Sequence, residues 1–194
     1  MKRLLARCWL FLWRWELVAP SSSLPDRCVM IAAPHTTNWD FPIMLALTKA
    51  SGVDVKWLGK ASLFRGPMGL LMRRLGGISV DRRAAGGMVA ALAGEFAARE
   101  RMVLIVPAEG TRSQTHCWKS GFYHIARQAN VPVVCGFVDG STRSGGLGPV
   151  VHLTGDIARD MDEFRAFYAG KTGLRAGRET PVRLKEEMIE GEAA

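Results

Sequence analysis

Two residues five positions apart, His35 and Asp40, carry the side chains of an acid–base pair. A histidine can remove a proton from a hydroxyl group near neutral pH. A carboxylate that holds one imidazole nitrogen leaves the other nitrogen facing a substrate. The spacing alone decides little, because a histidine near an aspartate is more often a structural hydrogen bond than a catalytic pair. The surrounding residues therefore have to carry the argument.

Those residues predict where the pair lies. The apolar run at residues 28–33 is typical of a buried strand, and Pro34 ends it. The polar residues 36–38, Thr-Thr-Asn, are good N-cap residues for a helix that follows. His35 is thus expected at the carboxyl end of a strand, with Asp40 in the first turn of the next helix. A helix start brings such positions into contact.

A second segment, residues 109–113, reads Glu-Gly-Thr-Arg-Ser and suits a phosphate group. The guanidinium of Arg112 can bind two phosphate oxygens at once, and Gly110, followed by Thr111, lets the backbone approach a ligand closely. Glu109 would repel a phosphate. We expect it to orient an arginine or to accept a hydrogen bond from the hydroxyl of an acceptor.

Two further cations are candidates for the same phosphate. Arg82 follows an apolar segment at residues 77–80, and Lys60 follows a predicted strand at residues 53–58. The alternative for Arg82, Arg112 and Lys60 is an ordinary solvated surface charge.

The order of these segments resembles the glycerophospholipid acyltransferase family, typified by bacterial 1-acylglycerol-3-phosphate acyltransferases. The sequence departs from the usual family pattern at two places, residues 106–110 and residue 135. The family usually has Phe-Pro-Glu-Gly, whereas here Pro107 is separated from Glu109 by an alanine, and Cys135 stands where a proline is usual. The four segments that carry the resemblance are residues 35–40, 77–82, 109–113 and 131–134.

The resemblance implies transfer of a fatty acyl group from a thioester, acyl-CoA or acyl carrier protein, to the free hydroxyl of a lysophospholipid. The first acceptor to expect is 1-acylglycerol-3-phosphate, which would become phosphatidic acid. His35 would be the general base and Asp40 its partner, and neither a metal ion nor a bound cofactor is expected. Three alternatives stay open: another lysolipid acceptor such as a lyso-aminolipid, a noncatalytic lipid-binding relative, and a thioester hydrolase.

Composition indicates one globular domain of 194 residues, with 48% hydrophobic and 23% charged residues. The four cysteines are far apart and lack the paired spacing of a zinc site, which favours a reducing compartment. They are Cys8, Cys28, Cys117 and Cys135.

The positive charge is unevenly distributed. Residues 1–85 contain 13 Lys and Arg against 5 Asp and Glu, whereas residues 86–194 contain 13 of each, so the first part carries the whole net charge of +8. Such an excess indicates a polyanionic partner. No nucleic-acid-binding motif accompanies it, so an anionic membrane surface and phosphate-bearing substrates are expected instead.

Residues 1–18 favour the membrane. Three tryptophans alternate with arginines along a predicted amphipathic helix, and its apolar run is shorter than the roughly 20 residues that span a bilayer. We expect this helix to lie in the headgroup layer, at the cytoplasmic face of a bacterial inner membrane. A signal peptide and a helix packed on the protein's own core are the alternatives. Residues 19–194 would form the acyltransferase domain.

The rest of the chain alternates strand and helix patterns, which predicts an α/β domain with a central, mostly parallel sheet flanked by helices. Five apolar side chains in residues 64–72 are expected to pack in the core, with an acyl channel as the alternative: Phe64, Met68, Leu70, Leu71 and Met72. Residues 140–148 form the loosest stretch. Strands are predicted at residues 28–33, 53–58, 77–80, 102–106, 131–138 and 150–153, and helices at residues 39–50, 67–75, 86–99, 119–128 and 158–168.

Overall fold

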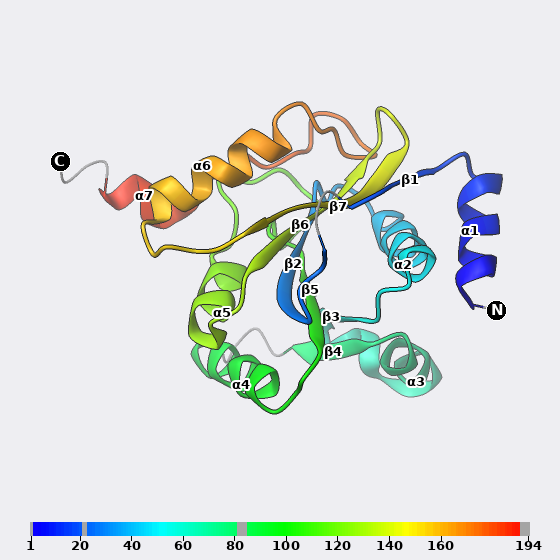
Figure 1. The fold of residues 1–194 in the computed structure, drawn as a ribbon, viewed down its shortest axis with the longest axis horizontal. Helices are drawn as coiled ribbons and strands as arrows, with labels where there is room; N and C mark the ends of the chain where they lie inside the picture. The colour runs from blue at the N-terminus through cyan, green and yellow to red at the C-terminus, as the bar shows by residue number, and fades with distance from the viewer. Residues whose placement is uncertain (1, 21–22, 81–84, 191–194) are drawn as a thin grey trace.

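A seven-stranded sheet forms the centre of the molecule, in the order β1-β7-β6-β2-β5-β3-β4 (Figure 1). The structure, a computed structural model, describes residues 2–20, 23–80 and 85–190. Neighbouring strands are parallel except for the antiparallel pair β6 and β7. The strands are β1 (Glu16–Val18), β2 (Arg27–Ala33), β3 (Val55–Lys60), β4 (Gly77–Val80), β5 (Met102–Val106), β6 (Val133–Asp139) and β7 (Ser144–Val151).

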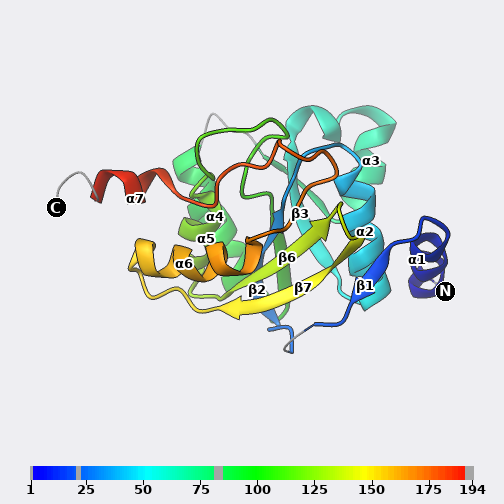
Figure 2. The same cartoon turned by 90° about the horizontal axis from the view of Figure 1, so that it is seen from above.

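Helices cover both faces of this sheet (Figures 1 and 2). On one face α2 packs on the sheet and α1 packs on α2; α4, α5 and α6 cover the other face. The helical elements are α1 (Lys2–Leu12), α2 (Asp40–Ser51), the short 3-10 helix η1 (Ala61–Phe64), α3 (Gly66–Arg74), α4 (Ala85–Ala97), α5 (Gly121–Ala129), α6 (Ile157–Tyr168) and α7 (Lys185–Glu190).

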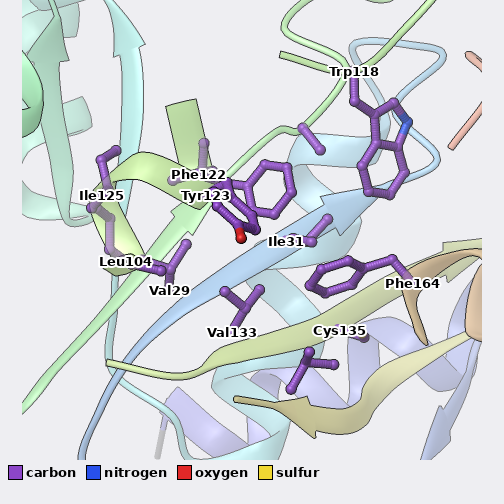
Figure 3. Packing of buried hydrophobic residues seen from close by; sticks show 14 of the residues in the cluster. Val29, Ile31, Leu104, Trp118, Phe122, Tyr123, Ile125, Val133, Cys135 and Phe164 are labelled. Atoms are coloured by element: carbon purple, nitrogen blue, oxygen red, sulfur yellow. The ribbon is translucent and has the colours of Figure 1, made fainter. Parts of the chain in front are cut away.

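The central strands are apolar at successive positions because both of their faces are buried. In β2, Val29 and Ile31 point into the cluster under α4, α5 and α6, and Cys28 and Met30 point into the cluster under α2. Figure 3 shows the first cluster, where Phe164 lies near the strand side chains. The predicted α/β fold with a mostly parallel sheet is confirmed.

The two strands at one edge of the sheet differ from expectation. Residues 16–18 leave the helix and form β1, parallel to β7, and β7 begins inside the stretch predicted to be loose. The glycines of β7 weaken the strand pattern in the sequence, and they also permit the close packing of β7 against its neighbours. A Cβ at Gly146 would lie 2.5 Å from the Val18 carbonyl oxygen, and one at Gly145 would lie 2.5 Å from Leu47 Cδ1.

The N-terminal helix α1 is shorter than predicted and has two different faces. Leu10 is buried against α2, whereas Phe11 and Leu12 are 81% and 76% exposed. One face thus packs on the protein and the other is apolar and uncovered. Within the described ranges, no helix combines the length and apolarity needed to cross a bilayer.

The predicted core packing of five apolar side chains in residues 64–72 holds for Phe64 and in part for Met72, which packs against the cluster under α2, and was wrong for the other three. Phe64 and Gly69 are buried, but Met68, Leu70 and Leu71 are 49–57% exposed. An apolar sequence pattern does not distinguish a helix that faces the core from one that faces outward at the edge of a sheet.

Candidate active site

His35 lies two residues beyond the end of β2, between that strand and the start of α2. Strand β5 is parallel to β2 and hydrogen-bonded to it, so the loops that follow the two strands meet at the carboxyl ends of the strands. The turn after β5 contains residues 109–113. Adjacent parallel strands therefore bring together the two segments that the sequence singled out.

His35 and Asp40 form the predicted pair. The His35 Nδ1 atom is 3.0 Å from Asp40 Oδ2, and the two side chains are 22% and 7% exposed. Within the described parts of the chain, no hydrogen bond is made to His35 Nε2. The imidazole is thus held through one nitrogen while the other can accept a proton from a ligand.

The carboxylate of Asp40 is fixed by the loop that precedes it. Its Oδ2 atom accepts hydrogen bonds of 2.7 Å from the backbone amides of both Thr36 and Thr37, and its Oδ1 atom accepts one of 3.1 Å from the Thr37 hydroxyl. The predicted capping by residues 36–38 was wrong. Trp39 is the N-cap of α2 and makes no side-chain cap hydrogen bond, since an indole has no acceptor for the first amides of the helix.

Glu109 has partners that the sequence did not indicate. It is 1% exposed, and its carboxylate accepts hydrogen bonds from the backbone amides of His35 (2.6 Å) and Thr180 (3.4 Å). Burial raises the pKa of this carboxyl, and the bonds from His35 and Thr180 oppose the rise. Glu109 thus contacts the backbone of His35, and among the described residues no arginine is one of its hydrogen-bond partners.

The rest of this turn is more open. Gly110 has φ +67°, and a Cβ there would lie 2.9 Å from Lys119 Cγ, so the turn favours glycine. The Thr111 hydroxyl accepts a weak 3.4 Å hydrogen bond from the Ser113 amide. Arg112 is exposed and makes no hydrogen bond or ion pair with the described residues, which leaves its guanidinium available to a ligand.

Of the two remaining predicted cations, Lys60 and Arg82, the structure describes only Lys60. Lys60 is exposed at the end of β3. Because β3 is parallel to β5, Lys60 lies at the carboxyl ends of the strands, as His35 does. Arg82 lies outside the described residues, and its role stays a prediction.

A segment near the C-terminus, residues 173–180, also lies beside the loop that contains His35, and the sequence patterns did not predict this. The Arg175 amide donates to the buried Thr36 hydroxyl at 3.1 Å, and a Cβ at Gly173 would lie 2.4 Å from Thr36 Cγ2. Glu179 holds the segment by accepting from the amides of Gly173 (2.9 Å) and Gly177 (2.7 Å). Its glycines and scattered charges have no periodicity, so no local signal could have placed it beside His35.

Comparisons with known proteins identify the family and a similar fold. A family model described as Acyltransferase matches residues 18–137, which include His35, Asp40 and the turn after β5. The fold is similar to the crystal structure of the 1-acyl-sn-glycerophosphate (LPA) acyltransferase PlsC from Thermotoga maritima. The TM-score is 0.55 at 17% identity, over 99% of this chain and 78% of that one. At that identity the likeness concerns the fold. A search of curated proteins found no match.

Proposed function

The chain belongs to the acyltransferase family, and we propose that it moves a fatty acyl group from a thioester donor to the free hydroxyl of a lysophospholipid. The observation that carries the proposal is the His35–Asp40 pair, with 3.0 Å between Nδ1 and Oδ2 and with Nε2 free to meet a ligand. A purely lipid-binding protein would have no use for a base held in this way.

The reaction follows from that geometry. His35 Nε2 takes the proton of the acceptor hydroxyl while the hydroxyl oxygen attacks the carbonyl carbon of the thioester. The carbon–sulfur bond then breaks, and the imidazolium returns its proton to the leaving thiolate. Asp40 stabilises the imidazolium and fixes which nitrogen carries hydrogen. The products are an ester and a free thiol, with no covalent enzyme intermediate.

The acceptor we propose is 1-acylglycerol-3-phosphate, which gives phosphatidic acid. Arg112 is exposed on the turn after β5, and a guanidinium can bind phosphate through two oxygens. Arg82 and Lys60 would add charge, and Gly110 and Thr111 would bring the backbone near the phosphate. Glu109 supports His35 through its backbone amide. Another lysolipid, such as a lyso-aminolipid, is the alternative acceptor.

The donor is acyl-CoA or acyl carrier protein, both acidic partners suited to the basic residues 1–85. The reaction would take place at an anionic membrane, at the cytoplasmic face of a bacterial inner membrane, with α1 lying in the headgroup layer. The exposure of Phe11 and Leu12 supports this placement of α1.

The direct test is acyl transfer by purified protein, with a panel of lysolipids, both donors and product detection by mass spectrometry. His35→Ala and Asp40→Asn are expected to lower kcat by at least about 100-fold, the range typical of losing a general base. His152→Ala is the matched control. His152 is exposed just beyond β7, and β7 runs antiparallel to its neighbour β6, so His152 lies at the opposite end of the strands from His35.

Turnover near that of the wild type in the His35→Ala protein would sink the proposal. Thiol release that does not depend on any lysolipid would instead identify a thioester hydrolase. Transfer to a lyso-aminolipid with none to 1-acylglycerol-3-phosphate would replace the acceptor and keep the chemistry.

A further inference from the structure

The helical segment η1–α3 presents an apolar surface to the outside. Leu63, Met68, Leu70 and Leu71 are 44–57% exposed. The segment is anchored through Phe64, which is buried and whose ring centre lies 5.8 Å from that of Trp57 in β3. The segment therefore packs against the fold through this side chain while its large aliphatic side chains are exposed.

Positive charge surrounds these side chains. Residues 55–80 contain five Lys and Arg and no Asp or Glu. Arg65, Arg73 and Arg74 are exposed on η1–α3 itself, and the Arg73 guanidinium lies 5.4 Å from the centre of the Phe64 ring. Exposed leucines with a rim of arginines and no acid match the chemistry of an anionic lipid surface, which offers hydrocarbon beneath negative headgroups.

The segment lies on the same side of the molecule as α1, with α2 beside both (Figures 1 and 2). Aromatic rings join α1 to the loop of the candidate active site: Trp9 and Trp13 are 5.7 Å apart, and Trp13 and Trp39 are 6.4 Å apart. Trp39, one residue before Asp40, is 64% exposed. Tryptophan is the residue that favours the boundary between headgroups and hydrocarbon.

We propose that the η1–α3 surface, formed by Leu63, Met68, Leu70 and Leu71 with Arg65, Arg73 and Arg74, docks on an anionic phospholipid bilayer as a second contact beside α1. Self-association of this surface is disfavoured, because a two-fold contact would bring the arginines of two copies together, and residues 55–80 contain no acid to pair with them. Two contacts fix the orientation of a protein on a membrane, which one helix does not.

The proposal is tested by cosedimentation of the full chain with phosphatidylethanolamine–phosphatidylglycerol vesicles and with phosphatidylcholine vesicles. Arg73→Gln/Arg74→Gln is expected to weaken binding to the anionic vesicles by about 25-fold, at roughly fivefold for each arginine near an anionic surface. Leu70→Gln/Leu71→Gln is expected to weaken binding to both compositions. The matched control is Arg159→Gln/Lys185→Gln, which removes two exposed charges from α6 and α7.

Circular dichroism and thermal melting establish that each variant is folded. If the leucine variant unfolds, the arginine variant still decides, because its substitutions are on the surface. Binding of the arginine variant equal to that of the control variant would overturn the proposal. So would a wild-type dimer, detected by analytical ultracentrifugation, that the leucine substitutions dissociate.

Acyl transfer to a short-chain lysolipid in free solution separates this inference from the proposed function. Both η1–α3 variants should retain that activity while losing binding to vesicles. Loss of transfer in solution with intact vesicle binding would place the leucines in a substrate channel and overturn the docking surface. Absence of transfer in the wild type would contradict the proposed function and leave the vesicle result to stand by itself.

Discussion

Two carboxylates bind different atoms of His35. Asp40 binds the imidazole, whereas Glu109 binds the backbone amide of the same residue. A side chain attached to a loop can be placed precisely only if the loop backbone is also held. The two carboxylates supply both restraints, Asp40 on the side chain of His35 and Glu109 on its backbone.

The buried carboxyl of Glu109 should leave a signature in the pH dependence of stability. Because burial raises its pKa above the ordinary value of 4.5, the folded state binds this proton more tightly than the unfolded state does. Its contribution to stability is therefore complete below about pH 4.5 and is lost as the pH rises through the raised pKa. Glu109→Gln keeps an oxygen acceptor for the His35 amide. Because glutamine does not ionise, the variant should not lose this stability as the pH rises.

Urea unfolding at a series of pH values measures the effect. The wild type should lose free energy of unfolding relative to Glu109→Gln as the pH increases above 4.5. Glu100→Gln, at an exposed position before β5, is the control. Curves for the wild type and the Glu109 variant that stay parallel over this interval would contradict the raised pKa.

At the scale of elements, the arrangement of the site comes from parallel neighbours. Strands β2, β5 and β6 are apolar, β-branched runs, and they were predicted close to their observed positions. The edge strands were harder to predict. Strand β1 has only three residues, and β7 is rich in glycine, which has low strand propensity. The two strands can pair because Gly146 and Gly145 leave room for the Val18 carbonyl and for Leu47.

The C-terminal segment, residues 173–180, has no regular structure, and the Thr36 hydroxyl joins it to the loop that contains His35. Thr36→Val keeps the shape of the side chain and removes the acceptor of the Arg175 amide. We expect a loss of about 1 kcal/mol in the free energy of unfolding. We also expect faster amide hydrogen exchange at residues 173–180, measured by mass spectrometry.

Thr48→Val is the matched control for this change. Thr48 is also buried, but its hydroxyl donates to the Leu45 carbonyl within α2. It should leave the exchange of residues 173–180 unchanged. Equal exchange in the wild type and the Thr36 variant would show that the segment is held by its other contacts alone.

For the whole molecule, the uneven charge and the exposed apolar side chains coincide. The net positive charge belongs to residues 1–85, and the same part of the chain contains α1, Trp39 and η1–α3 with their uncovered hydrophobic residues. A water-soluble surface would separate these features. Their combination favours an interface with headgroups outside and hydrocarbon inside.

Phe11→Ser/Leu12→Ser tests the contribution of α1. Because these side chains are 81% and 76% exposed, the free energy of unfolding should change by no more than about 0.5 kcal/mol. Vesicle cosedimentation should fall sharply, since the side chains would otherwise enter the acyl boundary. A large loss of stability with unchanged vesicle binding would favour a helix that packs only on its own protein. Deleting residues 1–18 is a poorer test, because it also removes β1 from the sheet.

By itself the sequence determined what depends on neighbours in the chain. Only a short loop separates His35, which follows a strand, from Asp40, which begins a helix, and such local geometry follows from residue types. Tertiary structure decided the rest. Glu109 meets His35 across 74 positions and Arg175 meets Thr36 across 139. The outward face of α3 depends on which surface of the sheet remains uncovered. Contacts of this kind arise only when strands pair and layers pack, and no periodicity along the chain records them.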